Sequence, residues 1–253
     1  MGKERNVKIL DVLIRFLRAK ASAARARGAR EPQRPHGHQL SVSRAQGRPA
    51  RDRGDSADSK SSPAADPNLP QLEVARDPER MREVFQRHLR PVDEKAYKVH
   101  ECRIVRMRYK RATSCILEYT LRLKELDTGR ELSQLVTGVI YAGDRARSIW
   151  EQLRASDPER ENPGAYRTFA PLSYIPDLDM LVQVFPYDNQ LPALPLLWAG
   201  PPPELEPLLL ARFGAGDWQT EAWNIEPVRY QAEARATLRL VMRAGDAASG
   251  RAE

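Results

Sequence analysis

The sequence contains only two cysteines, Cys102 and Cys115, among its 253 residues. Two are too few for the disulfide framework of a small secreted protein, so reduced thiols are expected. No apolar run approaches the roughly 18 residues that a membrane-spanning helix needs. The N-terminus also lacks an apolar segment followed by a small-residue cleavage site. We therefore predict a cytoplasmic protein without a membrane span.

The motifs of several enzyme classes are missing as well. The sequence holds no H-E-x-x-H, C-x-x-C, G-x-S-x-G or G-x-x-x-x-G-K-[ST] pattern. Cys115 is followed by Ile116 within an apolar stretch, which favours a packed thiol over a nucleophile. We name no catalytic, cofactor-binding or metal-binding residue in this chain.

Positive charge is concentrated in the first part of the chain. Residues 1–70 contain 15 Lys and Arg against 7 Asp and Glu, whereas residues 71–253 are nearly balanced at 26 against 27. Residues 6–20 have the apolar spacing of a short amphipathic helix, which would dock on protein or lie on an anionic membrane. Residues 21–70 have few large apolar side chains and are predicted to be a disordered linker. Its arginines could contact nucleic acid, but no aromatics are interleaved for base stacking.

Order is expected to resume near residue 77. Asp77 and Pro78 mark the start of a helix over residues 77–89. Strands are then predicted at 102–109, 114–124 and 131–141, because these segments are rich in β-branched and aromatic residues. Gly129 suits the turn before the third strand. A further helix should follow, with Asp144 as its cap.

The second half of the chain is harder to assign from its pattern. Residues 156–175 read as a polar loop, and residues 178–185 read as a buried strand. Residues 186–203 contain six prolines and predict an extended segment. A short helix should occupy residues 205–213 and end at Gly214. Trp218 and Trp223 then lead into a second hairpin and are expected to pack in a core.

The second hairpin repeats the first. When residues 104–132 are aligned without a gap to the residues 121 positions later, seven positions are identical, where chance would give about two. They are Ile104, Arg108, Tyr109, Leu117, Arg122, Gly129 and Arg130. The turns and strands recur in the same order. We therefore expect the hairpin to be duplicated, with Tyr109 and Tyr230 packed in equivalent positions.

The duplicated segments resemble a known family. Residues 107–119, Met-Arg-Tyr-Lys-Arg-Ala-Thr-Ser-Cys-Ile-Leu-Glu-Tyr, are similar to the R-Y-K-P-G-x-x-C-x-L-x-Y strand pair of bacterial aminoglycoside-phosphotransferase-like proteins. Residues 137–141 look like their third strand, and residues 185–194 and 216–230 look like the entry to a kinase small lobe. The resemblance covers roughly residues 75–253. It implies a kinase-like fold that holds ATP and Mg²⁺ between two lobes and phosphorylates a hydroxyl.

The chemistry that this family needs is absent from the chain. The third-strand lysine that contacts the nucleotide phosphates is replaced by Val139, and the turns at 110–113 and 231–234 contain no glycine. None of the four histidines precedes Gly-Asp, as the catalytic loop requires. Asp177 and Asp179 have the spacing of a metal-binding pair but are read as a turn before a strand. The resemblance is thus to the N-terminal part of such a protein, truncated before its catalytic lobe.

The sequence as a whole predicts an α+β fold built on an antiparallel β-meander with flanking helices, small-lobe-like and partly duplicated. We divide it into a basic leader (1–70), a first meander-and-helix unit with a proline-rich wrap (71–200) and an incomplete second copy (201–253). The chain should be inactive alone and hold no cofactor. A separately encoded catalytic lobe is one expected partner. The alternatives are a noncatalytic interaction module and a nucleic-acid binder that uses the basic leader.

Overall fold

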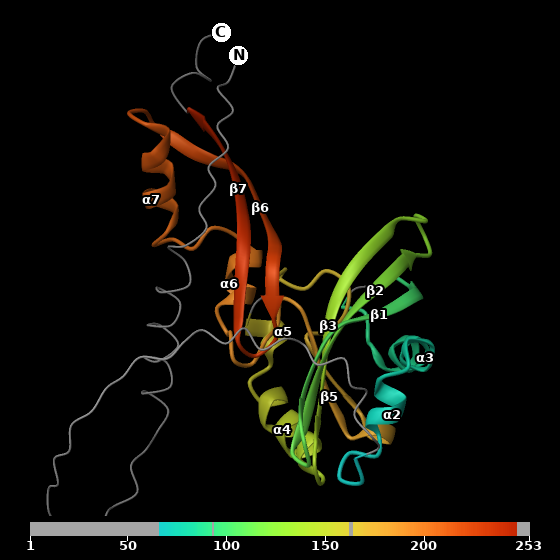
Figure 1. The fold of residues 1–253 in the computed structure, drawn as a ribbon. Coiled ribbons are helices and arrows are strands. Elements are labelled where there is room, and N and C mark those ends of the chain that lie inside the picture. The colour runs from blue at the N-terminus through green and yellow to red at the C-terminus, as the bar shows by residue number, and fades with distance from the viewer. Residues whose placement is uncertain (1–65, 93, 162–163, 247–253) are drawn as a thin grey trace, which may run out of the picture.

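The computed structural model describes residues 66–246, apart from residues 93, 162 and 163. It contains a five-stranded sheet and a separate two-stranded hairpin, each covered by helices (Figure 1). The predicted leader helix at 6–20 and most of the basic linker lie outside the described residues. The α+β class with an antiparallel sheet and flanking helices is confirmed.

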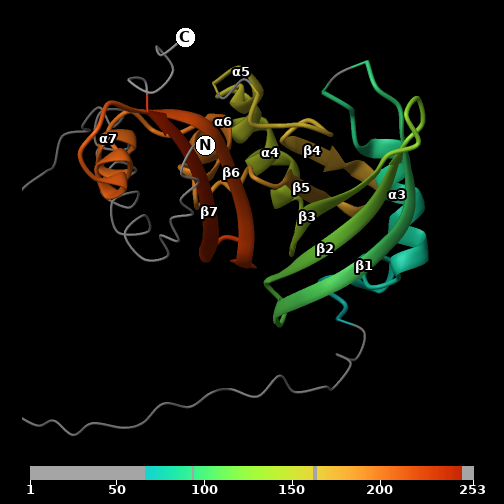
Figure 2. The same cartoon turned by 90° about the horizontal axis from the view of Figure 1, so that it is seen from above.

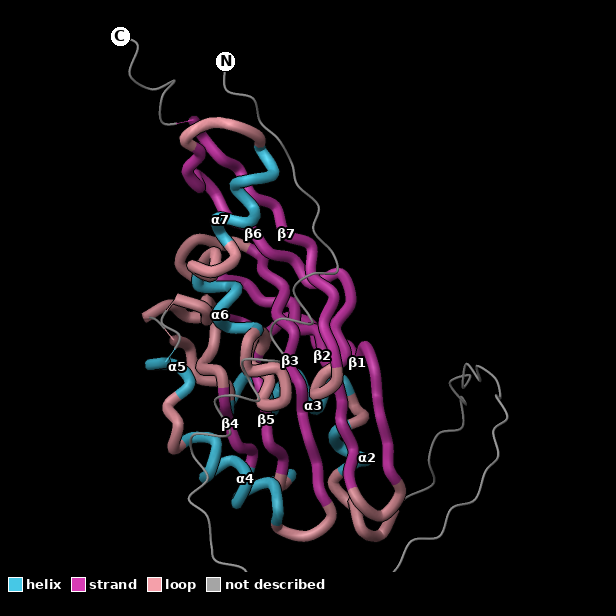
Figure 3. Tube along the Cα trace, turned by 90° about the vertical axis from the view of Figure 1, so that its left-hand side faces the viewer, coloured by secondary structure: helices cyan, strands magenta, loops and turns pink. Residues whose placement is uncertain are grey.

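The larger sheet is entirely antiparallel, with the strand order β1-β2-β3-β5-β4 (Figure 3). The third predicted strand has the expected bounds, and the first and second are longer than predicted by six residues and one residue. β5 lies between β3 and β4 because the chain passes through helices after β3, forms β4 at the outer edge of the sheet and then returns to pair as β5 with both β4 and β3. The strands are β1 Tyr97–Lys110, β2 Ser114–Glu125, β3 Glu131–Tyr141, β4 Leu172–Ile175 and β5 Met180–Val184.

Helices cover both faces of this sheet. α2 (Leu72–Ala75) and α3 (Pro78–His88) lie on one face, and α4 (Arg145–Arg154) lies on the other. The first face holds the main core, in which Tyr119 is fully buried and packs edge-to-face against Phe85. Alternate residues of each strand point to opposite faces, so each face gathers its own apolar set.

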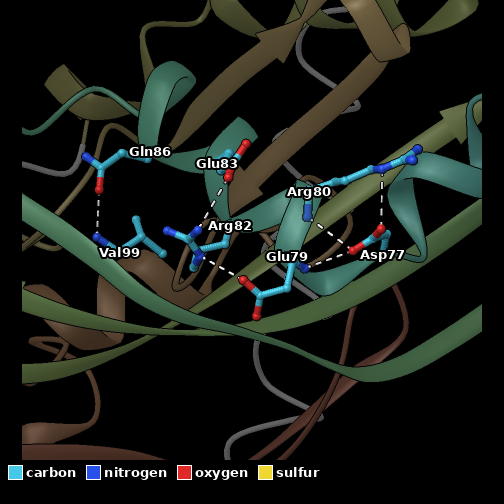
Figure 4. Close-up of polar contacts among 7 residues, drawn as sticks. All are labelled: Asp77, Glu79, Arg80, Arg82, Glu83, Gln86 and Val99. Atoms are coloured by element: carbon cyan, nitrogen blue, oxygen red, sulfur yellow. Dashed lines mark hydrogen bonds and ion pairs between the residues drawn. The ribbon is translucent and has the colours of Figure 1, made fainter.

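α3 is fixed at its start and along the edge of β1 (Figure 4). The Asp77 carboxylate accepts hydrogen bonds from the backbone N–H groups of Glu79 and Arg80, as the sequence predicted. Further along, the side chain of Gln86 accepts from the N–H of Val99 at 2.7 Å and donates to the carbonyl of Tyr97 at 3.1 Å. The helix therefore takes the place of a neighbouring strand at this end of β1.

Gly138 is required by the packing of the sheet against this core. A Cβ added there would lie 2.7 Å from the Met180 sulfur and 3.3 Å from a ring carbon of Tyr119. Both neighbours are fully buried, so neither can move freely.

We expect Gly138→Ala to lower the free energy of unfolding by about 1–3 kcal/mol through overpacking. Urea denaturation would measure the change. The double variant with Met180→Ala should recover part of the loss, because the added methyl then has room. A loss in the double variant equal to the sum of the two single losses would show that the contact is not the cause.

The second hairpin has its own small core. β6 (Trp218–Gln231) and β7 (Arg235–Asp246) pair only with each other among the described residues. α6 (Leu194–Ala199), α7 (Glu206–Leu210) and the 3-10 turn Ala211–Phe213 cover one face of the pair (Figure 2). Trp218 and Trp223 pack there, as expected. Two strands alone are marginally stable, so this helical cover is needed.

Four sequence-based predictions were wrong. The linker was expected to be disordered to residue 70, but residues 66–70 are ordered and Leu69 is buried. Residues 156–175 contain β4 and the short helix α5 (Pro158–Glu161), and residues 186–203 contain α6. Proline is accepted there because it stands in the first turn of α6, where no N–H is needed. Asp144 makes no capping bond to α4.

Candidate functional site: two latched hairpin turns

The turn between β1 and β2 is held by an aspartate from far upstream. One carboxylate oxygen of Asp66 accepts from the Tyr109 hydroxyl at 2.6 Å and from the backbone N–H of Ala112 at 2.9 Å. The other oxygen accepts from the N–H of Asn68. These hydrogen bonds, with that from Tyr109 first, lower the pKa of Asp66 to about 2. We call this arrangement, with Asp66, Tyr109 and Ala112, the first aspartate latch.

The second hairpin carries the same arrangement. One oxygen of Asp188 accepts from the Tyr230 hydroxyl at 2.9 Å and from the N–H of Glu233 at 2.7 Å. Its other oxygen accepts from the N–H of Gln190 at 2.8 Å. Asp188, Tyr230 and Glu233 form the second aspartate latch, in which Asp188 is only 1% exposed.

The surrounding backbone repeats with the same precision. β6 and β7 have the bounds of β1 and β2 shifted by 121 residues, and the first and last pairs of opposed residues coincide after the shift. Ala112 and Glu233 are both in the left-handed conformation, with φ of 53° and 58°. In each copy an aromatic side chain also donates to a carbonyl of a short helix, from Tyr119 to Ala75 and from Trp223 to Leu197, although the two donors come from non-equivalent strands. Tyr109 and Tyr230 therefore occupy equivalent positions in the two hairpins, as the sequence repeat predicted.

The latches reveal a sequence repeat that the hairpins alone did not. Asp66-Pro-Asn-Leu-Pro-Gln-Leu72 and Asp188-Asn-Gln-Leu-Pro-Ala-Leu194 share the pattern D-x-x-L-P-x-L. In both, the leucine N–H bonds back to the aspartate carbonyl, and the last leucine bonds back to the first. The signal was available, but one copy lay in the segment assigned to disorder.

The two turns differ in what surrounds them. The first turn is largely exposed at its tip, where Arg111 and Ala112 face solvent. The second turn lies on the β2–β3–β5 face of the larger sheet. Glu118 accepts from the N–H of Ala232 at 2.9 Å, and Arg108 donates to the carbonyl of the same residue.

The contact between the second turn and the sheet is extended by Gln183 of β5. Its amide nitrogen donates to the Glu233 carboxylate at 3.2 Å, and its amide oxygen accepts from the N–H of Asn189. We call Arg108, Glu118 and Gln183 the turn clamp. Phe185 adds an edge-to-face contact with Tyr230. The clamp recognises the backbone of a tight turn, and this contact buries Ala232 completely.

Glu233 is an unfavourably placed carboxylate. Burial, and then the charge of Asp188, raise its pKa above the ordinary value near 4.5. The Arg108 guanidinium and the Gln183 amide oppose this shift, and Tyr141 faces the same group. Because the folded protein binds this proton more tightly than the unfolded chain, the contribution of Glu233 to stability is greatest at low pH and is lost as the pH rises through its raised pKa.

The variant Glu233→Gln should remove this dependence. An amide keeps the contact with Gln183 but carries no charge beside Asp188. We expect the variant to match the wild type in thermal midpoint near pH 4 and to exceed it at pH 7. A variant that is less stable than the wild type at both pH values would show that the carboxylate charge is favourable there.

The positions at which the resemblance leads us to expect phosphate-binding residues are apolar. Val139, where the resemblance implies a lysine, is fully buried and packs with Ala146 of α4 and Leu181 of β5. In kinases the third-strand lysine pairs with a glutamate of the helix that follows. Here α4 turns Ala146, Ile149 and Trp150 towards the sheet. The contact between this helix and β3 is therefore hydrophobic.

The remaining candidate residues are placed as the sequence suggested. Asp177 and Asp179 lie in the short turn Pro176–Leu178 and just after it, before β5, and Asp179 accepts from the Tyr174 hydroxyl. Cys102 and Cys115 are buried, and burial raises the pKa of each thiol to about 12, so neither is a nucleophile at neutral pH. No group of three or more His, Cys, Asp or Glu side chains that could hold a metal occurs in the described part of the chain.

A cavity of about 1090 Å³ separates the open end of the larger sheet from the second hairpin. Arg130, Tyr166, Trp198 and Pro227 are among its lining residues, and the lining carries both positive and negative side chains. The Tyr166 hydroxyl is buried and has no hydrogen-bond partner among the residues that the structure describes. The cavity is large enough for a small polar molecule, but its mixed charge indicates no class of ligand.

No described helix is long and apolar enough to cross a membrane. Comparison with known proteins adds no assignment to this geometry. No protein-family model, curated protein or solved structure matches the chain.

Proposed function

We propose that the chain is the noncatalytic, small-lobe-like part of an ATP-dependent phosphotransferase that acts on a hydroxyl of a small molecule. The supporting observation is the order in which the strands and the helix of the larger sheet follow one another along the chain. A three-strand meander is followed by α4, which packs against Val139 on one face, and β4 and β5 then complete the sheet. This is the arrangement that the resemblance to aminoglycoside-phosphotransferase-like proteins implies.

The noncatalytic assignment is supported by two features of the same face. The resemblance implies a lysine at Val139, and kinases pair that lysine with a glutamate of the helix that follows. Val139 packs instead with Ala146 of α4. The neighbouring part of the face, around Glu118 and Gln183, is covered by the turn of the second hairpin. Phosphates would meet neither a cation at Val139 nor open space beside it.

A nucleotide titration tests the noncatalytic assignment. The chain should show no shift in thermal midpoint with MgATP up to millimolar concentration, because a ligand that binds the folded state must raise the midpoint. Isothermal titration calorimetry would provide the second measurement. Binding of MgATP with a Kd below about 100 μM would overturn this part of the proposal.

A complementation experiment tests the phosphotransferase assignment. The reading frame that adjoins the 3′ end of the gene should encode a lysine-bearing strand and a His-Gly-Asp loop. Coexpression should then yield ATP-dependent phosphorylation of hydroxyl compounds. The variant Asp188→Ala, in which the second turn is released, should weaken that activity. An adjoining frame without these features would count against the family.

A noncatalytic interaction module is the second candidate function. It is favoured by the edge of β7, which pairs with no described strand on its outer side. For such a module, a protein partner would raise the thermal midpoint while MgATP left it unchanged. The two candidates are therefore separated by whether the complex transfers phosphate.

A further inference from the structure

The two copies of the hairpin have different neighbours. In the first copy, β2 pairs with β1 on one side and with β3 on the other, through eleven opposed residue pairs from Ser114–Tyr141 to Lys124–Glu131. In the second copy, β7 pairs with β6 and with no other described strand. A strand of twelve residues thus has one edge that pairs with no described strand, and such an edge is a ready template for another strand.

The free edge of β7 has the geometry of the covered edge of β2. The two strands have equivalent bounds, and their pairing with β6 and β1 begins and ends at equivalent residues. The turns before them are held by equivalent aspartate latches. A strand that added to β7 would therefore meet the twist and spacing that β3 meets on β2.

The charge of β7 indicates the kind of strand that fits. Arg235, Arg239 and Arg243 recur at every fourth residue and are all exposed, so they lie on one face of the strand. Arg239 has Glu226 of β6 at 3.6 Å. Antiparallel pairing of two copies of β7 about Arg239 would oppose Arg235 to Arg243 and Arg239 to Arg239, and like charges in direct opposition destabilise a sheet. An acidic strand avoids this repulsion.

We propose that the free edge of β7 binds, in antiparallel orientation, a β-strand of a partner polypeptide that carries acidic side chains opposite Arg239 and Arg243. Main-chain hydrogen bonds supply most of the affinity, and the charge pairs select the partner. The partner strand takes the place that β3 takes on β2. The identity of that partner rests on the proposed function, which assigns the strand to the polypeptide with the catalytic lobe.

The chain itself supplies a probe for this edge. Residues 126–141 form the turn and the strand that cover β2, and the 121-residue shift places their equivalent directly after Asp246. Replacing residues 247–253 with a copy of residues 126–141 brings that strand to β7. In the copy, Ser133 falls opposite Arg243 and Thr137 opposite Arg239. One graft carries Ser133→Glu and Thr137→Glu, and the matched control carries Ser133→Lys and Thr137→Lys.

The acidic graft should slow hydrogen exchange of β7 peptides at least tenfold relative to the unmodified chain, as measured by mass spectrometry, and should raise the thermal midpoint. The lysine graft should do neither. A free peptide of residues 131–141 with the same two glutamates should protect β7 in the unmodified chain. Absence of protection by the acidic graft, or equal protection by the two grafts, would overturn the proposal.

Two further results separate this proposal from its alternatives. A concentration-dependent dimer of the unmodified chain in sedimentation, abolished by Val241→Pro, would assign the edge to a second copy of the chain and overturn the acidic partner. Protection of β7 by the acidic graft, without phosphorylation in the complementation experiment, would support the edge while rejecting the phosphotransferase. Phosphorylation without protection of β7 by the acidic graft would support the phosphotransferase and reject the proposed role of the β7 edge.

Discussion

The variant Asp188→Ala should lower the free energy of unfolding by about 3–5 kcal/mol. The carboxylate is buried and accepts from the Tyr230 hydroxyl and from the N–H groups of Glu233, Gln190 and Leu191. Hydrogen bonds to a charged acceptor contribute about 1.5–3 kcal/mol each, and their loss leaves buried donors without partners. Urea denaturation monitored by tryptophan fluorescence would measure the change, because Trp218 and Trp223 lie in the second hairpin.

Two controls show whether the latch is the cause. Asp188→Asn keeps the shape and one acceptor oxygen, so its loss should be smaller. Asp66→Ala removes the equivalent latch at the first turn, whose tip is exposed, and should shift the urea midpoint less than Asp188→Ala does. If Asp188→Ala changed the midpoint no more than Asp66→Ala, the burial of the second turn would contribute nothing measurable.

The variant Val139→Lys should be destabilised by at least about 3 kcal/mol and should not gain nucleotide binding. The side chain is fully buried and packs against the apolar side chains of Ala146 and Leu181. An ammonium group in such surroundings is costly, and its pKa falls. The deficit should therefore shrink as the pH rises towards 10, where the unfolded chain also loses its proton.

Val139→Met is the matched control, because it adds length without charge and should cost less than about 1.5 kcal/mol. Unfolding curves between pH 6 and 10 would compare the two variants. A lysine variant that is as stable as the methionine variant, and whose midpoint rises with MgATP, would show that this face still accepts a nucleotide. That outcome would contradict the noncatalytic assignment.

Local patterns were sufficient to predict most of the first sheet. The helix that starts at Asp77, the hairpin and the strand at 131–141 follow from capping, alternation and turn residues, and all three are present. β4 has only four residues and lies among polar ones, so its alternation was too short to recognise. α6 was hidden by the prolines around it and by Pro195 within it, because proline marks an extended segment unless its place in the first turn of a helix is known.

The latches could not be predicted from the hairpins. Asp66 reaches residues more than forty positions away, and its own neighbourhood is polar, so composition assigned it to the linker. Glu118 and Gln183 lie in strands whose pattern says only which face they point to. Whether these side chains contact the second turn depends on how the second hairpin packs against the sheet. The hydrophobic periodicity of the strands carries no information about that packing. The repeated D-x-x-L-P-x-L pattern was the one local signal.

Asp188 lies only four residues after the end of β5, and it is the aspartate of the second aspartate latch. Gln183, which lies in β5 of the larger sheet, contacts both Asn189 of the connecting segment and Glu233 of the second turn, so the second hairpin is held directly against the sheet. Repeats that are joined by a long linker can unfold independently of each other. These two hairpins are in direct contact, so we expect calorimetry to show a single cooperative transition in which both unfold together.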